Sequence, residues 1–344
     1  MAKSYLSDRV AALKPSMIRR FLEISSTMKE VISLGIGEPD FDSPPAVIEA
    51  GIQSLKDNET HYTSNRGIMP LRRAISDHLQ KLYGVGYSPE EDIVVTVGGS
   101  EALVLACSAI LNPGDEVILP TPCFVSYQGV ISLAGGKYVE VPCRMDNKFM
   151  PDPDYIEKAV TPKTKAILIN FPNNPTGAVA DKETLTAIGK IAEKYDLIVI
   201  SDEIYDRLIY GPEHQCFSAL PGMRERTILI GGFSKDYAMT GWRIGFACGP
   251  SEIMTGLGRV HQYIIMTAPT MAQYGALEAL ISCEDSVQEM AAEYNRRRQL
   301  IVQGLNYIGL PTFEPLGAFY AFPKVSVTGL DDNEFAERLL HENH

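Results

Sequence analysis

The stretch GFSKDYAMTGWRIG at residues 232–245 is the best guide to the architecture of this chain. The apolar run 227–230 that leads into it is typical of a buried strand. Lys235 therefore stands where a strand ends and a loop begins. Open α/β sheets bind their ligands at this edge, so the stretch predicts an α/β fold with a functional lysine.

Two side chains of this stretch suggest a cofactor. A lone lysine is usually a solvated surface residue, but a lysine amine partly removed from water can react with carbonyl compounds. Arg243, eight residues after Lys235, carries a fixed cation that suits bidentate binding of phosphate. An amine for an aldehyde and a guanidinium for a phosphate together indicate pyridoxal 5'-phosphate (PLP).

The composition excludes several other classes of protein. The 344 residues are 45% hydrophobic and 22% charged, which is typical of a globular protein long enough for a large domain and a smaller one. A net charge of −12 argues against nucleic-acid binding, and no run of about 18 apolar residues predicts a membrane span. The start of the chain has no signal-peptide pattern. The cysteines show no metal-ligand spacing, and we expect reduced, mostly buried thiols in a cytoplasmic protein: 107, 123, 143, 216, 248 and 283.

Apolar runs alternate with helix-like stretches along the first part of the chain, which predicts a mostly parallel sheet flanked by helices. The expected strands are 93–97, 116–119, 138–141, 166–169, 197–200 and 227–230. The expected helices are 100–111, 182–195, 252–266, 268–283, 286–308 and 333–340. The aromatic run 317–323 is expected to be a short strand, and the basic run 296–298 a solvated helix face.

Residues 232–245 match each restricted position of the lysine-attachment signature of class I/II aminotransferases, and the chain resembles this fold-type I PLP family over nearly its whole length. The resemblance implies a large PLP-binding domain at 46–285 and a small α+β domain built from 1–45 and 286–344. It also implies a homodimer whose active site is shared between subunits. An amino acid and a 2-oxo acid would be the substrates.

The resemblance gives roles to three polar residues that follow predicted strands. Asp202 in Ser-Asp-Glu-Ile-Tyr can pair with the pyridine nitrogen of PLP and keep it protonated. Tyr205, three residues later, and Asn174 in Asn-Asn-Pro-Thr-Gly are expected to contact the 3'-oxygen, and Asn174 also the substrate. The resemblance makes Lys235, Asp202 and Tyr205 the catalytic residues, with Lys235 forming the internal aldimine and moving the proton.

The phosphate is expected to bind where a predicted strand joins a helix at Gly98, Gly99 and Ser100. Small residues let backbone N–H groups approach an anion at a helix N-terminus, and Ser100 is also a suitable N-cap. Many relatives carry a serine three residues before the lysine, where this chain has Gly232, so Ser234 is the candidate for a substitute hydroxyl.

Three more residues are placed by the resemblance. Phe124 is expected to stack on the cofactor ring. Tyr62 is expected to cross the dimer interface to the partner's phosphate. Gly37, in Gly-Ile-Gly-Glu-Pro-Asp, is expected to offer its backbone to the substrate; Asp40 stands where a dinucleotide motif needs a small residue, which excludes NAD.

The sequence departs from the family's pattern at its end. Relatives hold the substrate α-carboxylate with an arginine in a C-terminal strand, and this chain stops at His344 before any such motif. We therefore expect a C-terminally truncated chain with an incomplete small domain.

The sequence predicts an aminotransferase that moves the amino group of an aromatic or broad range of L-amino acids to a 2-oxo acid such as 2-oxoglutarate. The run Tyr-Thr-Ser-Asn at 62–65 is most similar to the aromatic branch, while aspartate- and alanine-type enzymes stay open. A PLP-dependent C–S β-lyase is a second possibility on the same fold. A PLP-binding sensor of a transcription regulator is disfavoured because residues 1–30 are too short for a DNA-binding domain.

Overall fold

A seven-stranded sheet with strand order β1-β7-β6-β5-β4-β2-β3 forms the centre of the protein. The computed structural model describes residues 5–13, 21, 24, 28, 31–35 and 37–343. The strands are β1 (Ile93–Thr96), β2 (Glu116–Thr121), β3 (Lys137–Pro142), β4 (Thr164–Asn170), β5 (Ile198–Asp202), β6 (Thr227–Gly232) and β7 (Gly245–Cys248). Strands β2 to β6 run parallel, and β7 is antiparallel to both of its neighbours. The predicted α/β class with a mostly parallel sheet is confirmed.

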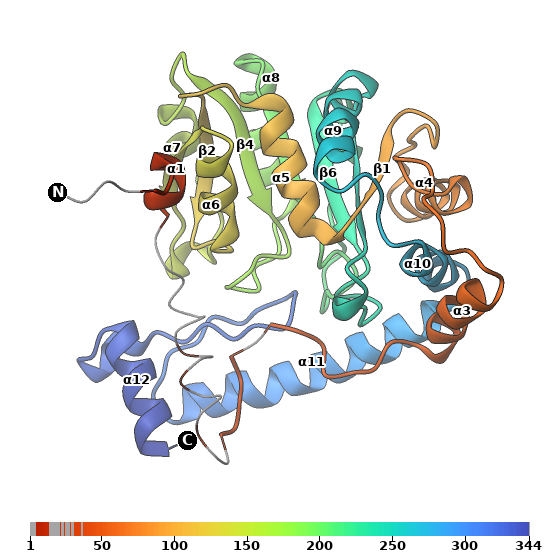
Figure 1. Cartoon of the computed structure of the whole chain (residues 1–344). Coiled ribbons are helices and arrows are strands. Elements are labelled where there is room, and N and C mark those ends of the chain that lie inside the picture. Colours follow the sequence, from red (N-terminus) through yellow and green to blue (C-terminus); the bar gives the residue numbers. More distant parts are fainter. Residues whose placement is uncertain are drawn as a thin grey trace.

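Helices cover both faces of the sheet (Figure 1). The α-helices are α1 (Asp8–Ala11), α3 (Pro45–Lys56), α4 (Met69–Tyr83), α5 (Gly98–Ile110), α6 (Ser126–Leu133), α7 (Pro153–Lys158), α8 (Lys182–Lys194), α9 (Ser251–Ile264), α10 (Thr270–Ser282), α11 (Glu284–Tyr307) and α12 (Asp332–Asn343). Helices α5, α6 and α9 pack on one face. On the other face α7 and α8 cover the β4–β5 side, and α4 and α10 cover the β1–β7 side.

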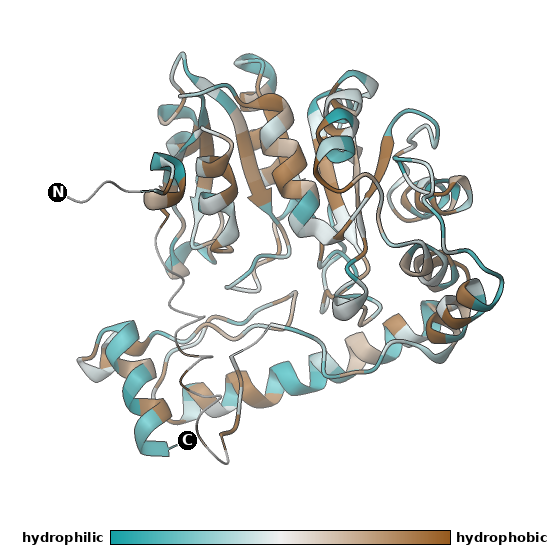
Figure 2. Ribbon diagram, viewed as in Figure 1, coloured by the Kyte–Doolittle hydropathy of each residue, from teal (hydrophilic) through white to brown (hydrophobic). Residues whose placement is uncertain are grey.

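Alternation along each strand produces these two cores. In β1, Val94 packs with α5 and α9, while its neighbours Ile93 and Val95 pack with α4 and α10. Side chains of a strand point to opposite faces in turn, so a strand buried on both sides must be apolar throughout. The hydrophobic colour of the central strands in Figure 2 shows this pattern, and the outer helices are polar on one side.

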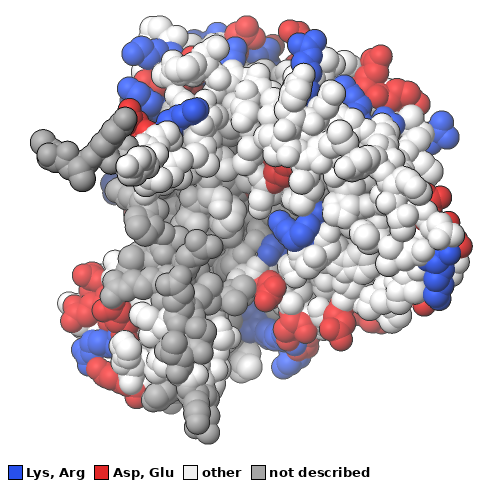
Figure 3. Space-filling model, in the orientation of Figure 1, with Lys and Arg blue, Asp and Glu red and all other residues white. Residues whose placement is uncertain are grey.

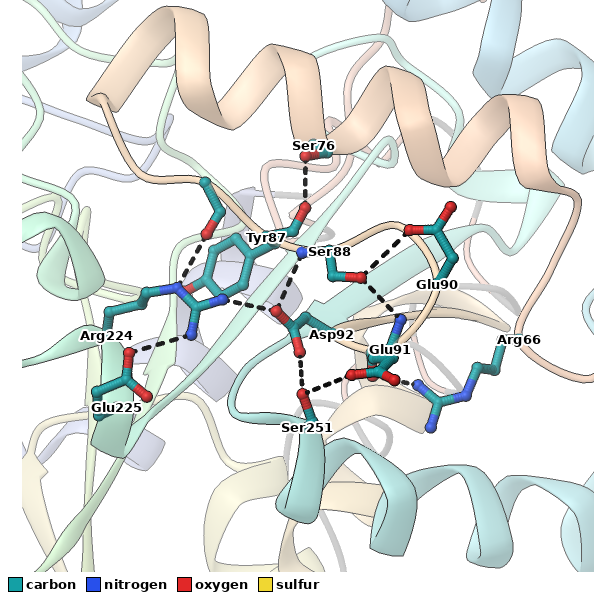
Figure 4. Close-up of polar contacts among 11 residues, drawn as sticks. Arg66, Ser76, Tyr87, Ser88, Glu90, Glu91, Asp92, Arg224, Glu225 and Ser251 are labelled. Carbon is teal, nitrogen blue, oxygen red and sulfur yellow. Dashed lines mark hydrogen bonds and ion pairs between the residues drawn. The ribbon is translucent and has the colours of Figure 1, made fainter.

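A polar network fixes the start of β1 (Figure 4). The Oδ2 of Asp92 accepts hydrogen bonds from Ser88 N at 3.0 Å and from Arg224 Nη2 at 2.6 Å. Its Oδ1 accepts from Ser251 Oγ at 2.6 Å, and Ser251 is the first residue of α9. The Arg224 guanidinium also stacks 4.8 Å from the Tyr87 ring centroid. One buried carboxylate therefore joins β1, α9 and the turn before β6 at the edge away from the candidate site.

The sequence predictions differ from the structure at several places. The short strand β7 was not predicted. The aromatic strand expected at 317–323 is wrong, because only Gly317 and Pro323 form isolated bridges there. Helix α5 begins at Gly98 with Val97 as its N-cap, so Ser100 lies in the first turn rather than at the cap. The division into domains at 46 and 285 stays a prediction.

The basic run on α11 is not simply solvated. Arg297 contacts Asp40 at 2.8 Å, and Arg298 contacts Glu314 at 2.9 Å. These ion pairs fasten α11 to the segment before α3 and to the loop that precedes the aromatic run.

Charges of both signs stand around the rim of the face in Figure 3 and a few lie near its middle, with a broad uncharged area to their right. None of the helices in the described part of the chain is long and apolar enough to cross a membrane. All six cysteines are free, and four of them are buried.

Candidate active site

A cleft of about 910 Å³ lies at the carboxyl ends of the parallel strands. The carboxyl end of β4 points toward the part of the molecule that holds α11 (Figure 1). Ten of the twelve predicted site residues line the cleft: Gly37, Gly99, Ser100, Phe124, Asn174, Asp202, Tyr205, Ser234, Lys235 and Arg243. Residues more than 200 positions apart therefore meet at this edge of the sheet.

Asp202 ends β5 as a buried carboxylate. Its Oδ2 accepts a hydrogen bond from Tyr127 Oη at 2.7 Å, and its Oδ1 accepts one from Ile204 N at 3.2 Å. Burial raises the pKa of Asp202 to about 6, although the hydrogen bond from Tyr127 favours the ionised form. A cationic partner would stabilise the ionised form of a carboxylate that is held in such a dry place. Tyr127 was not predicted, because its segment was interpreted only through Phe124.

Lys235 follows β6 and is half-buried. Its Nζ donates a hydrogen bond to the carbonyl oxygen of Gly37 and lies 5.4 Å from the ring centroid of Phe319. Burial lowers the pKa of Lys235 to about 8, and the nearby charge of Arg243 acts in the same direction. An appreciable share of the amine is then neutral near physiological pH, which makes it a nucleophile.

Three polar side chains form a chain of contacts between the two walls of the cleft. Tyr320 Oη exchanges a hydrogen bond with Tyr205 Oη and accepts one from Asn174 Nδ2 at 3.2 Å. A Cβ at Gly37 would collide with the Tyr320 hydroxyl, so glycine is required for this close approach. Tyr320 was missed by the sequence analysis because its partners come from distant elements.

Arg243 and the N-terminus of α5 lie together at one end of the cleft. Gly98 has a φ of +73°, and a Cβ there would stand 2.8 Å from Arg243 Nη2. Gly98 does not line the cleft itself but leaves room for the guanidinium that does. Glu101 Oε2 accepts a hydrogen bond from Val97 N at 2.6 Å, which fixes the first turn of α5. A cation beside a helix N-terminus favours an anion such as phosphate.

Two further predicted residues line the walls and one lies outside. Phe124 packs edge-on against Tyr127, with ring centroids 5.6 Å apart. Ser234 is buried next to Lys235. Tyr62 is 80% exposed and does not line the cleft of this single chain. Its segment is tied to the end of α9 by a 2.8 Å hydrogen bond from Asn65 Nδ2 to the Met266 carbonyl.

This set of groups fits PLP. Arg243 and the α5 N-terminus could hold a phosphate, the Lys235 amine an aldehyde carbon, and Asp202 a protonated ring nitrogen. The room that Gly98 leaves beside Arg243 and the dry carboxylate of Asp202 both agree with such a ligand. The fold and the cleft thus have the features of a fold-type I PLP enzyme.

Comparison with known proteins identifies the family. The profile of the family "Aminotransferase class I and II" matches residues 29–344. The chain is 51% identical to the putative aminotransferase YugH of Bacillus subtilis and 46% identical to an aspartate aminotransferase of Pyrococcus abyssi, each match covering 98% of this chain and 87% of the relative. The crystal structure of an aromatic aminotransferase from Pyrococcus horikoshii superposes with a TM-score of 0.90 at 44% identity, over 94% of this chain and 87% of that one. The chain belongs to the class I and II aminotransferase family and is an aminotransferase.

Proposed function

We propose that this enzyme binds PLP through Lys235 and moves the amino group of an aromatic or broad range of L-amino acids to a 2-oxo acid such as 2-oxoglutarate. The observation that carries the proposal is the pair of perturbed groups in one cleft, an amine that is easily neutralised and a buried carboxylate. Bound PLP draws electrons from the Cα of the amino acid, which makes its proton removable.

The side chains divide the work by position. Asp202 would keep the ring nitrogen protonated, and Tyr205 and Asn174 would donate hydrogen bonds to the oxygen beside the aldehyde. Phe124 would face the ring, and the backbone of Gly99 and Ser100 together with Ser234 and Arg243 would hold the phosphate, with Gly98 contributing to this site through the room that it leaves for Arg243. Lys235 would hold the cofactor through its amine, and the freed amine would act as the general base that moves the proton. Gly37 and Asn174 face the substrate, and the 3.2 Å contact from Asn174 to Tyr320 steadies the amide.

The lining of the cleft supports a substrate with an uncharged side chain. Among the described lining residues, Lys235 and Arg243 are the basic ones, and both are assigned to the cofactor. The remaining wall includes Cys123, Val125 and Phe322, which offer apolar surface. A distal carboxylate would lack a partner among these residues, which favours aromatic donors over aspartate.

A homodimer with shared sites completes the proposal. Tyr62, Tyr263, Ile264 and Met266 are all at least 47% exposed, and Asn65, three residues after Tyr62, donates a hydrogen bond to the Met266 carbonyl. Apolar side chains gathered in this way mark an interaction surface. Tyr62 of each subunit would reach the phosphate held by the other. The free cysteines support a cytoplasmic location.

A donor screen with verified cofactor tests the function. Borohydride should fix the cofactor to a single peptide that contains Lys235, and phenylalanine and tyrosine should give the highest kcat/KM with 2-oxoglutarate. Preference for aspartate would refute the substrate assignment. Release of pyruvate and ammonia from cystathionine without an oxo acid would show a C–S lyase instead.

A further inference from the structure

A small pocket outside the cleft is lined by Asp236, the residue after Lys235, and by Asp206, the residue after Tyr205. Its volume of about 20 Å³ is the room of one water molecule. Helices α4 and α10, strands β6 and β7 and the turns after β5 and β6 line it. Its titratable lining has no part in the function proposed above: His78, Tyr83, Glu203, Asp206, Asp236 and Tyr237.

Two carboxyl groups meet in this pocket. Asp236 is buried, and its side chain is hydrogen-bonded to that of Asp206. The Oδ1 of Asp236 has no hydrogen-bond partner. Burial, and then the charge of Asp206, raise the pKa of Asp236 well above its usual range. Two carboxylates in contact cannot both be ionised in a dry place, so Asp236 keeps its proton and its O–H donates a hydrogen bond to Asp206.

Asp206 and its neighbours make further polar contacts around the pair. Tyr83 Oη, from α4, donates a second hydrogen bond to Asp206 Oδ2. Arg207 is engaged with Glu284 of α11, with Nη1 and Oε2 3.0 Å apart. The other charged neighbour, Glu203, is paired with His214. Burial lowers the pKa of His78 and raises that of Tyr237, so both are neutral near pH 7.

The sequence neighbours of this pair are the groups that face the cleft. Asp236 follows Lys235, and Asp206 follows Tyr205. The carboxyl pair therefore joins the turn that carries the amine to the turn that carries the phenol. An ionised carboxylate at Asp236 would favour the charged ammonium of Lys235, whereas a neutral acid does not.

We propose that Asp236 is a positioning residue for Lys235: as a neutral acid hydrogen-bonded to Asp206, it fastens the Lys235 turn to the Tyr205 turn without adding a negative charge that would act on the amine. This role rests on the proposed function for its purpose, but the proton and the link exist with or without cofactor. Aspartate is suited to this positioning role because its short side chain fits the pocket and its protonated carboxyl group can donate a hydrogen bond.

The test compares Asp236→Asn with Asp236→Ala. The amide keeps a donor toward Asp206 and no charge, whereas alanine removes the link. Asp196→Asn is the control, because this carboxylate is 97% exposed. Three quantities are measured: the infrared band of a protonated carboxylic acid at about pH 8, the pH midpoint for alkylation of Lys235 in cofactor-free protein, and the rate at which Lys235 captures PLP.

The acid band should be present in the wild type and in Asp196→Asn and absent from both Asp236 variants. Asp236→Asn should keep the wild-type alkylation midpoint, whereas removal of an ionised neighbour would lower it by about one unit or more. Asp236→Ala should capture PLP at least about tenfold more slowly, and Asn should restore the rate.

Absence of the band from the wild type, or a lowered midpoint in Asp236→Asn, would overturn the proposal. Equal capture rates in the alanine and wild-type proteins would remove the positioning role. If Asp236→Ala does not fold, the infrared band of the wild type and the alkylation midpoint of Asp236→Asn still test whether Asp236 is a neutral acid. Failure of wild-type Lys235 to bind PLP would refute the proposed function. The infrared band and the alkylation midpoint would still show whether Asp236 is protonated.

Discussion

Replacing Asp202 with asparagine should make the cofactor-free protein more stable near neutral pH. Burial raises the pKa of Asp202 in the folded chain to about 6, against an ordinary value of 3.8. A difference of about two units corresponds to about 3 kcal/mol of unfolding free energy. The wild type loses about 3 kcal/mol of unfolding free energy when Asp202 ionises in its dry position. Asp202→Asn loses none of it, because its amide stays neutral.

The pH dependence follows from the sign of the shift. Because the folded-state pKa is the higher one, the stabilising contribution of protonated Asp202 is complete below its unfolded pKa and disappears as the pH rises through about 6. Between about pH 4.5 and pH 7.5 the wild type should therefore lose about 2 kcal/mol relative to Asp202→Asn. The acid of Asp202 and the amide of Asp202→Asn make different hydrogen bonds with Tyr127 and Ile204, but this difference does not depend on pH. It therefore cancels when the stabilities at the two pH values are subtracted.

Urea unfolding of both cofactor-free proteins at these two pH values measures the effect. Addition of PLP should raise the stability of the wild type and have a much smaller effect on Asp202→Asn, because the charge partner of the ring nitrogen is gone. A stability difference between the proteins that does not change with pH would refute the reasoning. It would mean that Asp202 titrates near its ordinary value and that its environment is well solvated.

Three further predictions concern the other groups of the site. Lys235→Ala should lose transamination by a factor of at least about 10²–10⁴ and should show no borohydride-fixed cofactor, since the proton carrier is missing; a variant with residual activity within tenfold would contradict this. Gly98→Ala should weaken PLP binding by at least about tenfold because its Cβ would press on Arg243, whereas Gly114→Ala, also at positive φ but in open space, should bind normally in the same PLP titration. Tyr62→Ala and Lys235→Ala proteins should regain part of the activity after verified subunit exchange, and no recovery would argue against shared sites.

The local sequence was sufficient for the strands that end at the site. Apolar β-rich runs preceded Lys235, Asp202 and Asn174, and ligands of parallel sheets gather at the ends of such strands. The structure brings these three residues into one cleft. The signals were strong because buried parallel strands are apolar on both faces.

Features that depend on distant partners were not predictable in this way. Strand β7 has four residues, including a glycine, and forms because β1 and β6 provide partners on both sides. The contacts of Tyr127 with Asp202 and of Tyr320 with Tyr205 exist only after folding. The run 317–323 has strand-like composition, but its only strand contacts are isolated bridges. Residue type alone does not show which of these segments will find a strand partner or which tyrosines will reach the site.

The pairing of β1 with β7 also has a consequence for biosynthesis. Strand β1 is the first to leave the ribosome, and β7, with which it pairs, is the last of the seven. About 150 residues separate them, which at about 5–20 residues per second means about 8–30 s of translation. During that time four residues that are fully or nearly fully buried in the finished enzyme lack their partner, and an unpaired apolar strand is a template for aggregation. The yield of soluble protein should therefore rise with chaperone capacity and with faster translation of the region between the two strands.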